Sequence, residues 1–321
     1  MFQVEPILWL QSFETPFLTW LMATVSLLGY SIVYGILLAV ITYGLNLRKG
    51  LAIFMVLVIG GIATYGLKNG LKFPRPSDID IRVNEPNHAP TLKLVDQGAG
   101  EFFWSLPKEE AMEAAKIQKN WSYGLPSGHV SAATAFVLSL FLFFRKKGLF
   151  IFALSWIVLM ALSRMYLGRH FIADVLGGAL VGIAAVFLGK FLLRPLDVLG
   201  TSLLEKRAFV PILLLVIPLI VLSPFIQIID ADNVGRLLGL VLAYFAINQI
   251  GYSTEDGNIK QRFLRTFVAI VCSALLAFLV DYGTTVIGFS EAQLPTLTKT
   301  FLSTSVPFIG AFVVLKRLKF Y

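Results

Sequence analysis

The chain has 321 residues, of which 57% are apolar and 14% are charged, and 27 basic residues against 19 acidic ones give a formal net charge of +8. An ordinary soluble domain carries about 25% charged residues, so this composition excludes a disordered protein, a fibrous protein and a plain cytosolic enzyme. The basic residues stand between long apolar runs, so membrane topology explains the charge better than nucleic acid does. The single Cys272 excludes a disulfide framework and a multi-cysteine metal site.

A helix needs about 20 apolar residues to cross a bilayer core that is about 30 Å thick. Nine stretches approximate this length and predict an all-α, polytopic transmembrane helical bundle: 30–47, 51–72, 129–144, 148–168, 172–193, 208–228, 235–250, 266–288 and 300–316. Residues 5–28 are a weaker stretch that Pro16 interrupts, which indicates an interfacial or re-entrant helix, with a tenth span as the alternative. The connection 77–128 is too polar to span, and residues 107–120 within it predict a polar helix.

Clusters of Lys and Arg follow every second predicted span, beginning with the first. The alternate connection 229–234 has no basic residue, and the connection 289–299 has only Lys299. Short loops rich in Lys and Arg stay on the cytoplasmic side of a membrane. The acidic N-terminus and the long connection 77–128 are therefore expected outside, and the C-terminus inside.

Seven ionisable residues lie at the opposite, non-cytoplasmic ends of the predicted spans: Lys68, Lys72, Arg75, His129, Arg164, Arg169 and His170. Ionisable residues at membrane level are functional candidates by default. Snorkelling of a long side chain is the alternative for Lys72 or Arg169 taken alone. As a set they favour phosphate chemistry, because Lys and Arg stabilise the charge that phosphoryl transfer spreads over its oxygens. Histidine can act there as nucleophile or proton donor.

The local spacings fit this chemistry. His170 and Asp174 are four residues apart in the first turn of a predicted span, so both lie on one helix face and the carboxylate can orient the ring. Residues 126–129 lead into another span, and backbone amides at such a helix N-terminus form an anion site. Gly128 permits close approach of a ligand to the backbone.

Three segments, in this order, resemble the three-part signature of the type 2 phosphatidic acid phosphatase (PAP2) superfamily: Lys68-x6-Arg75-Pro76, Pro126-Ser127-Gly128-His129 and Ser163-Arg164-x5-His170-x3-Asp174. The resemblance covers about residues 15–195. It implies that His170 is the nucleophile, that Asp174 orients it, and that His129 protonates the leaving oxygen and later activates water. It also implies a set of phosphate-binding residues: Lys68, Arg75, Ser127, Gly128 and Arg164. The family needs no metal, and no other cofactor is expected.

Two further residues match no motif. His88 lies in the polar connection and is expected at the surface. Asp281 lies in the outer half of the eighth predicted span, which favours an ion pair within the bundle over a polar cavity.

The resemblance implies an integral-membrane, metal-independent lipid phosphate phosphatase that works through a phosphohistidine on the extracytoplasmic face. Phosphatidate, phosphatidylglycerophosphate, a sphingoid-base phosphate or a polyprenyl diphosphate would each suit a cationic pocket. A lipid phosphotransferase with the same intermediate, and a transporter of phosphorylated lipid, are the alternatives. The expected partners are the lipid substrate and the bilayer, with no nucleic acid, and the expected location is a bacterial inner membrane with a periplasmic site. The oligomeric state stays open.

The resemblance also divides the chain. Residues 1–195 form the predicted phosphatase core, and residues 196–321 form an additional membrane segment of four spans that carries no motif. A lipid entrance, an oligomer contact and a separate partner module are equally weighted roles for this segment.

Overall fold

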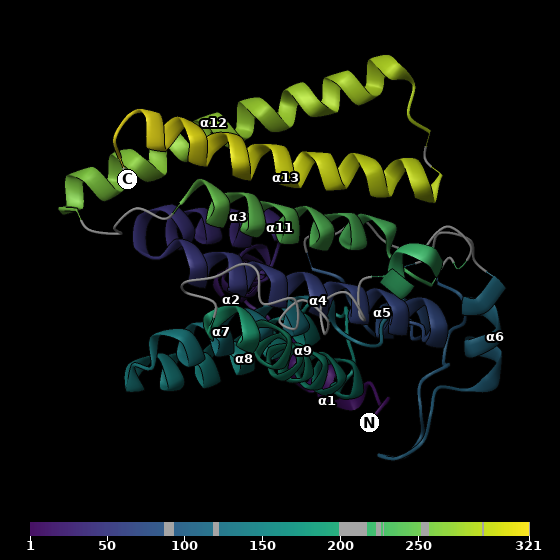
Figure 1. Ribbon diagram of the computed structural model, residues 1–321. Helices are drawn as coiled ribbons and strands as arrows, with labels where there is room; N and C mark the ends of the chain where they lie inside the picture. The colour runs from purple at the N-terminus through teal and green to yellow at the C-terminus, as the bar shows by residue number, and fades with distance from the viewer. Residues whose placement is uncertain are drawn as a thin grey trace. The chain divides into compact units, whose positions relative to one another are not determined.

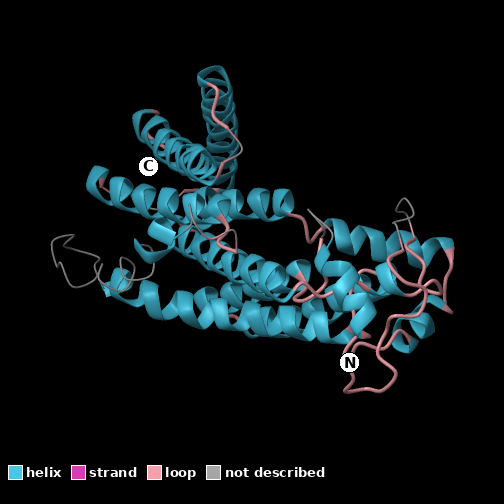
Figure 2. Cartoon of the chain, turned by 90° about the vertical axis from the view of Figure 1, so that its right-hand side faces the viewer, coloured by secondary structure: helices cyan, strands magenta, loops and turns pink. Residues whose placement is uncertain are grey.

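The computed structural model describes residues 1–86, 93–117, 122–198, 217–222, 226, 228–251, 257–290 and 292–320. This described part of the chain is helical and holds no β-strand, only one isolated bridge between Asp80 and Gln97 (Figure 2). The all-α fold class is therefore confirmed. Two compact units emerge, the first formed by Met1–Tyr34 with Ala63–Val186 and the second by Gly35–Ile62 with Phe187–Tyr321. The functional division between residues 195 and 196 stays a prediction.

The first unit contains two N-terminal helices, two short helices near the polar connection and three long helices (Figure 1). Their bounds are α1 Glu5–Gln11, α2 Pro16–Leu27, α5 Pro76–Ile79, α6 Glu109–Ile117, α7 Gly128–Phe144, α8 Lys147–Tyr166 and α9 Ile172–Val198. Two of the long helices cross the division: α4, Leu47–Leu71, begins in the second unit and ends in the first, and α9 begins in the first and ends in the second. The predicted polar helix within residues 107–120 is confirmed as α6.

The second unit is built from α12, α13 and three other elements that the sequence brings together from both halves of the chain. The bounds are α3 Ser31–Ala39, the π-helix η1 Val40–Leu45, α11 Ala231–Ile250, α12 Ile259–Ile287 and α13 Gln293–Arg317. Within it, Asp281 of α12 forms an ion pair with Lys299 of α13 at 2.5 Å. The expected pairing of Asp281 inside the bundle is thereby confirmed.

The number of spans differs from the prediction. Among the described residues, six helices are long and apolar enough to cross a membrane, and α7, with 17 residues, is a shorter apolar helix. Helices α2 and α3–η1 qualify only as a pair, bent by 59°. The predicted span 30–47 is therefore one arm of a broken span or re-entrant loop, and the other arm comes from the weak stretch 5–28. Most of the predicted span 208–228 lies outside the described residues.

The bend between α2 and α3 lies at a tightly packed position. Gly29 sits at the break, and a Cβ added there would meet the His129 ring at 2.6 Å. The chain therefore turns where it passes over the start of α7. Hydropathy alone does not reveal this bend, because apolar residues continue through it.

Helices α7 and α9 approach closely through glycines on α9. A Cβ at Gly178 would lie 2.5 Å from the carbonyl oxygen of Ser127, and one at Gly182 would lie 2.6 Å from that of Ser131. The amide of Ser127 donates to the carbonyl of Asp174 over 2.8 Å. The start of α7 and the start of α9, which carry two of the three sequence motifs, are thus held side by side.

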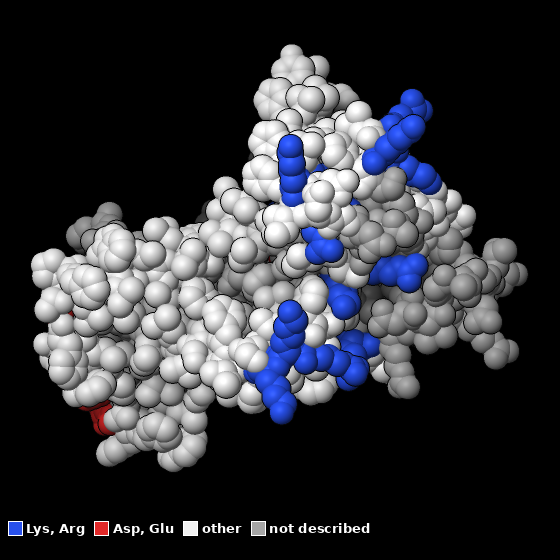
Figure 3. Space-filling model, turned by 90° about the vertical axis from the view of Figure 1, so that its left-hand side faces the viewer, with Lys and Arg blue, Asp and Glu red and all other residues white. Residues whose placement is uncertain are grey.

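Basic side chains gather on the face drawn in Figure 3, where few acidic ones are seen. In the first unit, Arg145, Lys146 and Lys147 between α7 and α8 are exposed. This pattern agrees with the sequence-based orientation, which stays a prediction.

Candidate active site

His170 lies in the short connection between α8 and α9, where its side chain is only 2% exposed. Its Nδ1 lies 3.3 Å from Oδ2 of Asp174, which is in the first turn of α9 and fully buried. The same Oδ2 accepts the amide of Phe171 over 2.9 Å, so the carboxylate is fixed by the backbone. With the Nδ1 proton donated to this carboxylate, Nε2 keeps its lone pair free for a ligand.

The surroundings of His170 keep it neutral. Burial lowers the pKa of His170 well below its ordinary value, and the nearby positive charges of Arg164, Lys68 and Arg75 lower it further, with a contribution from His129. A neutral imidazole is the form in which histidine can attack phosphorus. The structure thus brings the three predicted phosphate-binding cations into electrostatic contact with the predicted nucleophile.

His129 lies in the first turn of α7 and faces the end of α2. Its ring makes an edge contact with Tyr30, with centroids 4.9 Å apart. Its Nε2 is buried and has no hydrogen-bond partner among the described atoms. A buried ring nitrogen without a partner is available to a bound molecule.

The three cations reach this region from three helix ends. Lys68, in the last turn of α4, donates to the carbonyl oxygens of Tyr123 and Gly124. Arg75, which precedes α5, donates through Nη2 to the Ser122 hydroxyl over 2.5 Å. A second arginine, in the last turn of α8, has its own partner: Arg164 Nη1 donates to the Ser26 hydroxyl over 2.5 Å.

Ser127 and Gly128 enter the site differently from the prediction. The expected free amide of Ser127 is wrong, because the close α7–α9 packing makes this N–H donate to the Asp174 carbonyl. The hydroxyl of Ser127 is buried and has no partner among the described atoms. A Cβ at Gly128 would meet nothing nearer than a Thr64 methyl at 3.7 Å, so the space beside its backbone is open.

Several buried polar atoms of the predicted site have no hydrogen-bond partner among the described atoms: Arg75 Nε, Ser127 Oγ, His129 Nε2, Arg164 Nε and Asp174 Oδ1. Each such group costs about 1–3 kcal/mol when it stays unpaired. Four of the five can donate a proton to an acceptor oxygen. The set therefore fits a small oxyanion that brings several acceptor oxygens.

The connection between α8 and α9, which carries His170, is held by residues at the start of the polar connection 77–128. The amide of Ser77 donates to the carbonyl of Gly168 over 3.3 Å. Gly168 has a φ of 68°, and any side chain there would overlap the carbonyl oxygen of Asn84. Arg169 forms an ion pair with Glu85 at 3.1 Å, with both side chains largely buried. Arg169 is thus a paired residue of this loop contact and not a snorkelling side chain.

Other residues stand outside the site or were missed by the sequence reasoning. Lys72, at a φ of 53°, donates its backbone amide to the Lys68 carbonyl over 2.9 Å, but within the described ranges its side chain makes no hydrogen bond or ion pair with the site. His88 lies outside the described residues. Ser26, Tyr30 and Ser122 contact the predicted site residues. They could not be predicted from the sequence, because they are uncharged and match no motif. In the described part of the chain, no three His, Cys, Asp or Glu side chains form a group that could hold a metal ion.

Comparison with known proteins finds a similarity over the segment that carries the predicted catalytic and phosphate-binding residues. The family model described as the PAP2 superfamily matches residues 49–193. Residues 49–193 are thus similar to a PAP2 superfamily domain. The match extends from the start of α4 into α9 and contains the three signature segments.

Three relatives show which proteins this chain is similar to. Lipid A 4'-phosphatase of Bacteroides thetaiotaomicron is 29% identical over 134 residues, which are 38% of this chain and 57% of the relative. Sphingosine-1-phosphate phosphatase 2 of Mus musculus is 32% identical over 181 residues, 54% of this chain and 40% of the relative. Phosphatidylglycerophosphatase B of Bacillus subtilis is 41% identical over 78 residues, 22% of this chain and 38% of the relative. These matches span less than two thirds of each relative, and no solved structure matches the chain.

Proposed function

We propose that this protein is an integral-membrane phosphatase that hydrolyses a lipid phosphate through a phosphohistidine on His170. The observation that carries the proposal is a set of buried polar atoms without partners among the described atoms, several of them on the residues whose charges act on His170. The PAP2 domain and the phosphatase names of its relatives support the reaction class. The long apolar helices support a membrane location.

In the first step, Nε2 of His170 attacks phosphorus and the bond from phosphorus to the ester oxygen breaks. The leaving oxygen takes a proton from His129, so that the lipid departs as a neutral alcohol. Asp174, held at Nδ1, stabilises the positive charge that develops on the His170 ring. Lys68, Arg75 and Arg164 donate to the phosphoryl oxygens, where negative charge accumulates in the transition state.

In the second step, water attacks the phosphorus of the phosphohistidine. His129 takes a proton from this water, and the bond between phosphorus and His170 Nε2 breaks. Inorganic phosphate leaves, and the proton that His129 takes from water replaces the one that it gave to the leaving oxygen. Each group thereby returns to its starting state without any other reactant.

The decisive experiment measures phosphate release by the purified protein in detergent. The substrates are phosphatidate, phosphatidylglycerophosphate, a sphingoid-base phosphate, a polyprenyl diphosphate and lipid A. Release from at least one of them, lost in His170→Ala and retained in Asp281→Asn, is expected. Full release by His170→Ala would overturn the mechanism.

The same preparation separates the alternatives. Adding lipid or sugar alcohols tests the phosphotransferase, because a transferase passes the phosphoryl group to them in preference to water. Movement of a labelled lipid phosphate across vesicles by His170→Ala would favour a transporter. The complete nucleophile and proton-donor pair favours an enzyme over a transporter, and the acceptor assay decides between hydrolase and phosphotransferase.

The site is proposed to face the periplasm of a bacterial inner membrane. Residues on opposite sides can be compared by replacing Cys272 with Ser and placing one cysteine at Glu113 in α6 or at Lys146 before α8. A membrane-impermeant thiol reagent applied to intact cells should label position 113 and not position 146. The reverse pattern would overturn the orientation.

A further inference from the structure

The polar connection carries an exposed aromatic turn, which we define as residues 102–106. Its Phe102 and Trp104 side chains are 72% and 79% exposed, and Phe103 and Leu106 are also exposed. Four large apolar side chains within five residues are unusual for a loop that is otherwise polar. Such a patch marks a surface that meets another apolar phase.

The aromatic turn has a defined conformation. The Ser105 amide and hydroxyl both donate to the carbonyl oxygen of Phe102, over 3.0 and 2.8 Å. The Phe102 amide donates to the Ser105 hydroxyl over 2.9 Å. The rings of Phe103 and Trp104 pack edge to face at 4.8 Å. The aromatic side chains are thus presented by a closed turn.

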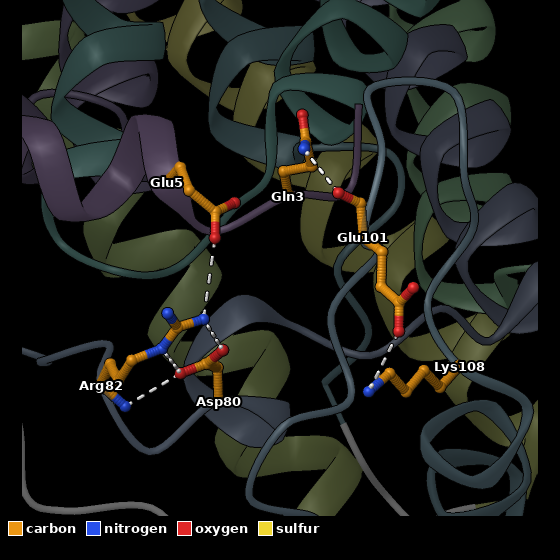
Figure 4. Close-up of polar contacts among 6 residues, drawn as sticks. All are labelled: Gln3, Glu5, Asp80, Arg82, Glu101 and Lys108. Atoms are coloured by element: carbon orange, nitrogen blue, oxygen red, sulfur yellow. Dashed lines mark hydrogen bonds and ion pairs between the residues drawn. The ribbon is translucent and has the colours of Figure 1, made fainter.

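The aromatic turn is tied to the N-terminal segment of the chain (Figure 4). Gln3 Nε2 donates to the Glu101 carbonyl over 3.0 Å, and the Glu101 carboxylate lies 3.6 Å from Lys108 Nζ. The amide of Gly100 donates to the carbonyl of Phe2 over 2.9 Å. The flank before the turn is therefore held beside the N-terminus, and the contact between Glu101 and Lys108 joins it to the flank after the turn.

That N-terminal segment also exposes large aromatic side chains: Trp9, Phe13, Phe17 and Trp20. The last two belong to α2, which is one arm of the bent apolar pair that is long enough for a membrane. Exposed aromatic side chains therefore occur both on a candidate membrane segment and on the turn, which is hydrogen-bonded to the same N-terminal region. Trp and other amphipathic rings concentrate at the level of lipid headgroups.

We propose that the aromatic turn inserts into the interfacial layer of the leaflet that borders the active site. A lipid surface is the occupant because one planar interface can cover the turn and the exposed N-terminal aromatics together, whereas a soluble partner at the turn would leave α2 uncovered. This inference stands on exposure and packing and does not require the proposed phosphatase activity.

Membrane contact at the turn has a direct route to the site. Phe2, whose carbonyl accepts the Gly100 amide, is buried and stacks on Phe73 at 5.0 Å. It also meets the edge of Phe171 at 5.6 Å. Phe73 and Phe171 are neighbours in sequence of the site residues Arg75 and His170. Lipid bound at the turn is therefore expected to order the segments that carry Arg75 and His170 as well as to hold the loop.

A depth measurement tests the contact without any enzyme assay. Cys272 is replaced by Ser, and Trp104→Cys is labelled with an environment-sensitive fluorophore in phosphatidylcholine–phosphatidylglycerol vesicles. Spin-labelled lipids that quench at headgroup level should quench this probe several-fold more than a probe at Glu113→Cys, an exposed position on α6. Equal quenching at the two positions would overturn the proposal.

A kinetic measurement tests the consequence. Phe103→Ser combined with Trp104→Ser should raise KM for a lipid phosphate in vesicles by about tenfold, through lost interfacial binding. The same variant should hydrolyse a water-soluble short-chain phosphate as the unaltered protein does, and Trp104→Phe should keep the low KM. An unchanged KM in vesicles would overturn this consequence. Lipid quenching without any hydrolysis would instead refute the proposed function and leave the membrane contact standing.

Discussion

Each compact unit buries an arginine, and the two arginines differ in what their guanidinium groups meet. In the second unit, Arg265 of α12 donates to the carbonyl oxygens of Tyr43 and Gly44 at the end of η1, so the protein itself supplies its acceptors. In the first unit, Arg164 is equally buried, yet its Nε has no partner among the described atoms. Burial of a charge therefore does not identify a site. Unpaired atoms on a buried charge do.

The carboxylates repeat this contrast. Asp281 in the second unit is paired with Lys299 on the neighbouring helix. Asp174 in the first unit is fully buried, and its Oδ1 has no partner among the described atoms. Arg265 and Asp281 bind groups on neighbouring elements of the second unit, whereas Arg164 and Asp174 in the first unit have atoms that a ligand can still bind. Four substitutions test whether this distinction holds.

The largest effect is expected at His170. Replacing it with Ala removes the nucleophile and should lower kcat by about 10⁴-fold or more, the range seen when a covalent catalyst loses its attacking group. The measurement is phosphate release together with acid-labile incorporation of labelled phosphate into the protein. Incorporation that persists in His170→Ala would place the covalent intermediate elsewhere.

The next largest effect is expected from replacing Arg164, and replacing Arg265 should affect stability instead of catalysis. Arg164→Ala should lower kcat/KM by about 10²-fold, because a donor to the transition-state oxygens is lost. Arg265→Ala should leave turnover per folded molecule unchanged and lower the free energy of unfolding by about 1–3 kcal/mol, since buried carbonyl oxygens lose their donor. Activity assays and thermal unfolding in detergent measure both. Equal catalytic losses in the two variants would break the contrast.

The protonation state of His170 gives a third test. Because burial and nearby cations lower its pKa, His170 should stay neutral as the pH falls through 6.5, the ordinary value for histidine. The chain has three histidines, so ¹⁵N-histidine NMR can follow each one, with His170→Asn assigning the signal. A neutral tautomer should persist at pH 5.5. Titration near 6.5 would show that the ring is not desolvated.

The smallest effect is expected at the ion pair of the second unit. Asp281→Asn should change the free energy of unfolding by less than about 1 kcal/mol, because both partners are partly exposed. Phosphate release should not change. A large loss of turnover would show that the second unit takes part in the reaction.

The contact between His170 and Asp174 could be predicted from the sequence, whereas the predicted number of spans is not confirmed among the described residues. His170 and Asp174 were predictable as a contacting pair because helical periodicity puts residues four apart on one face. The cations were conspicuous because charge is rare in an apolar chain. Ser26 and Tyr30 were not predictable, since they are uncharged residues beside the bend and match no motif. The pairing of Glu85 with Arg169 joins distant segments, and nothing local encodes it.

Gly168 has a consequence for how this protein can diverge. Its left-handed backbone leaves no room for a side chain beside the Asn84 carbonyl, while Ser77 and Glu85 grip the same connection. The length of the segment between Arg75 and Glu85 therefore sets the position of the connection that carries His170. Insertions or deletions within it would shift His170, so chimaeras that exchange the remainder of the polar connection should be joined after Glu85.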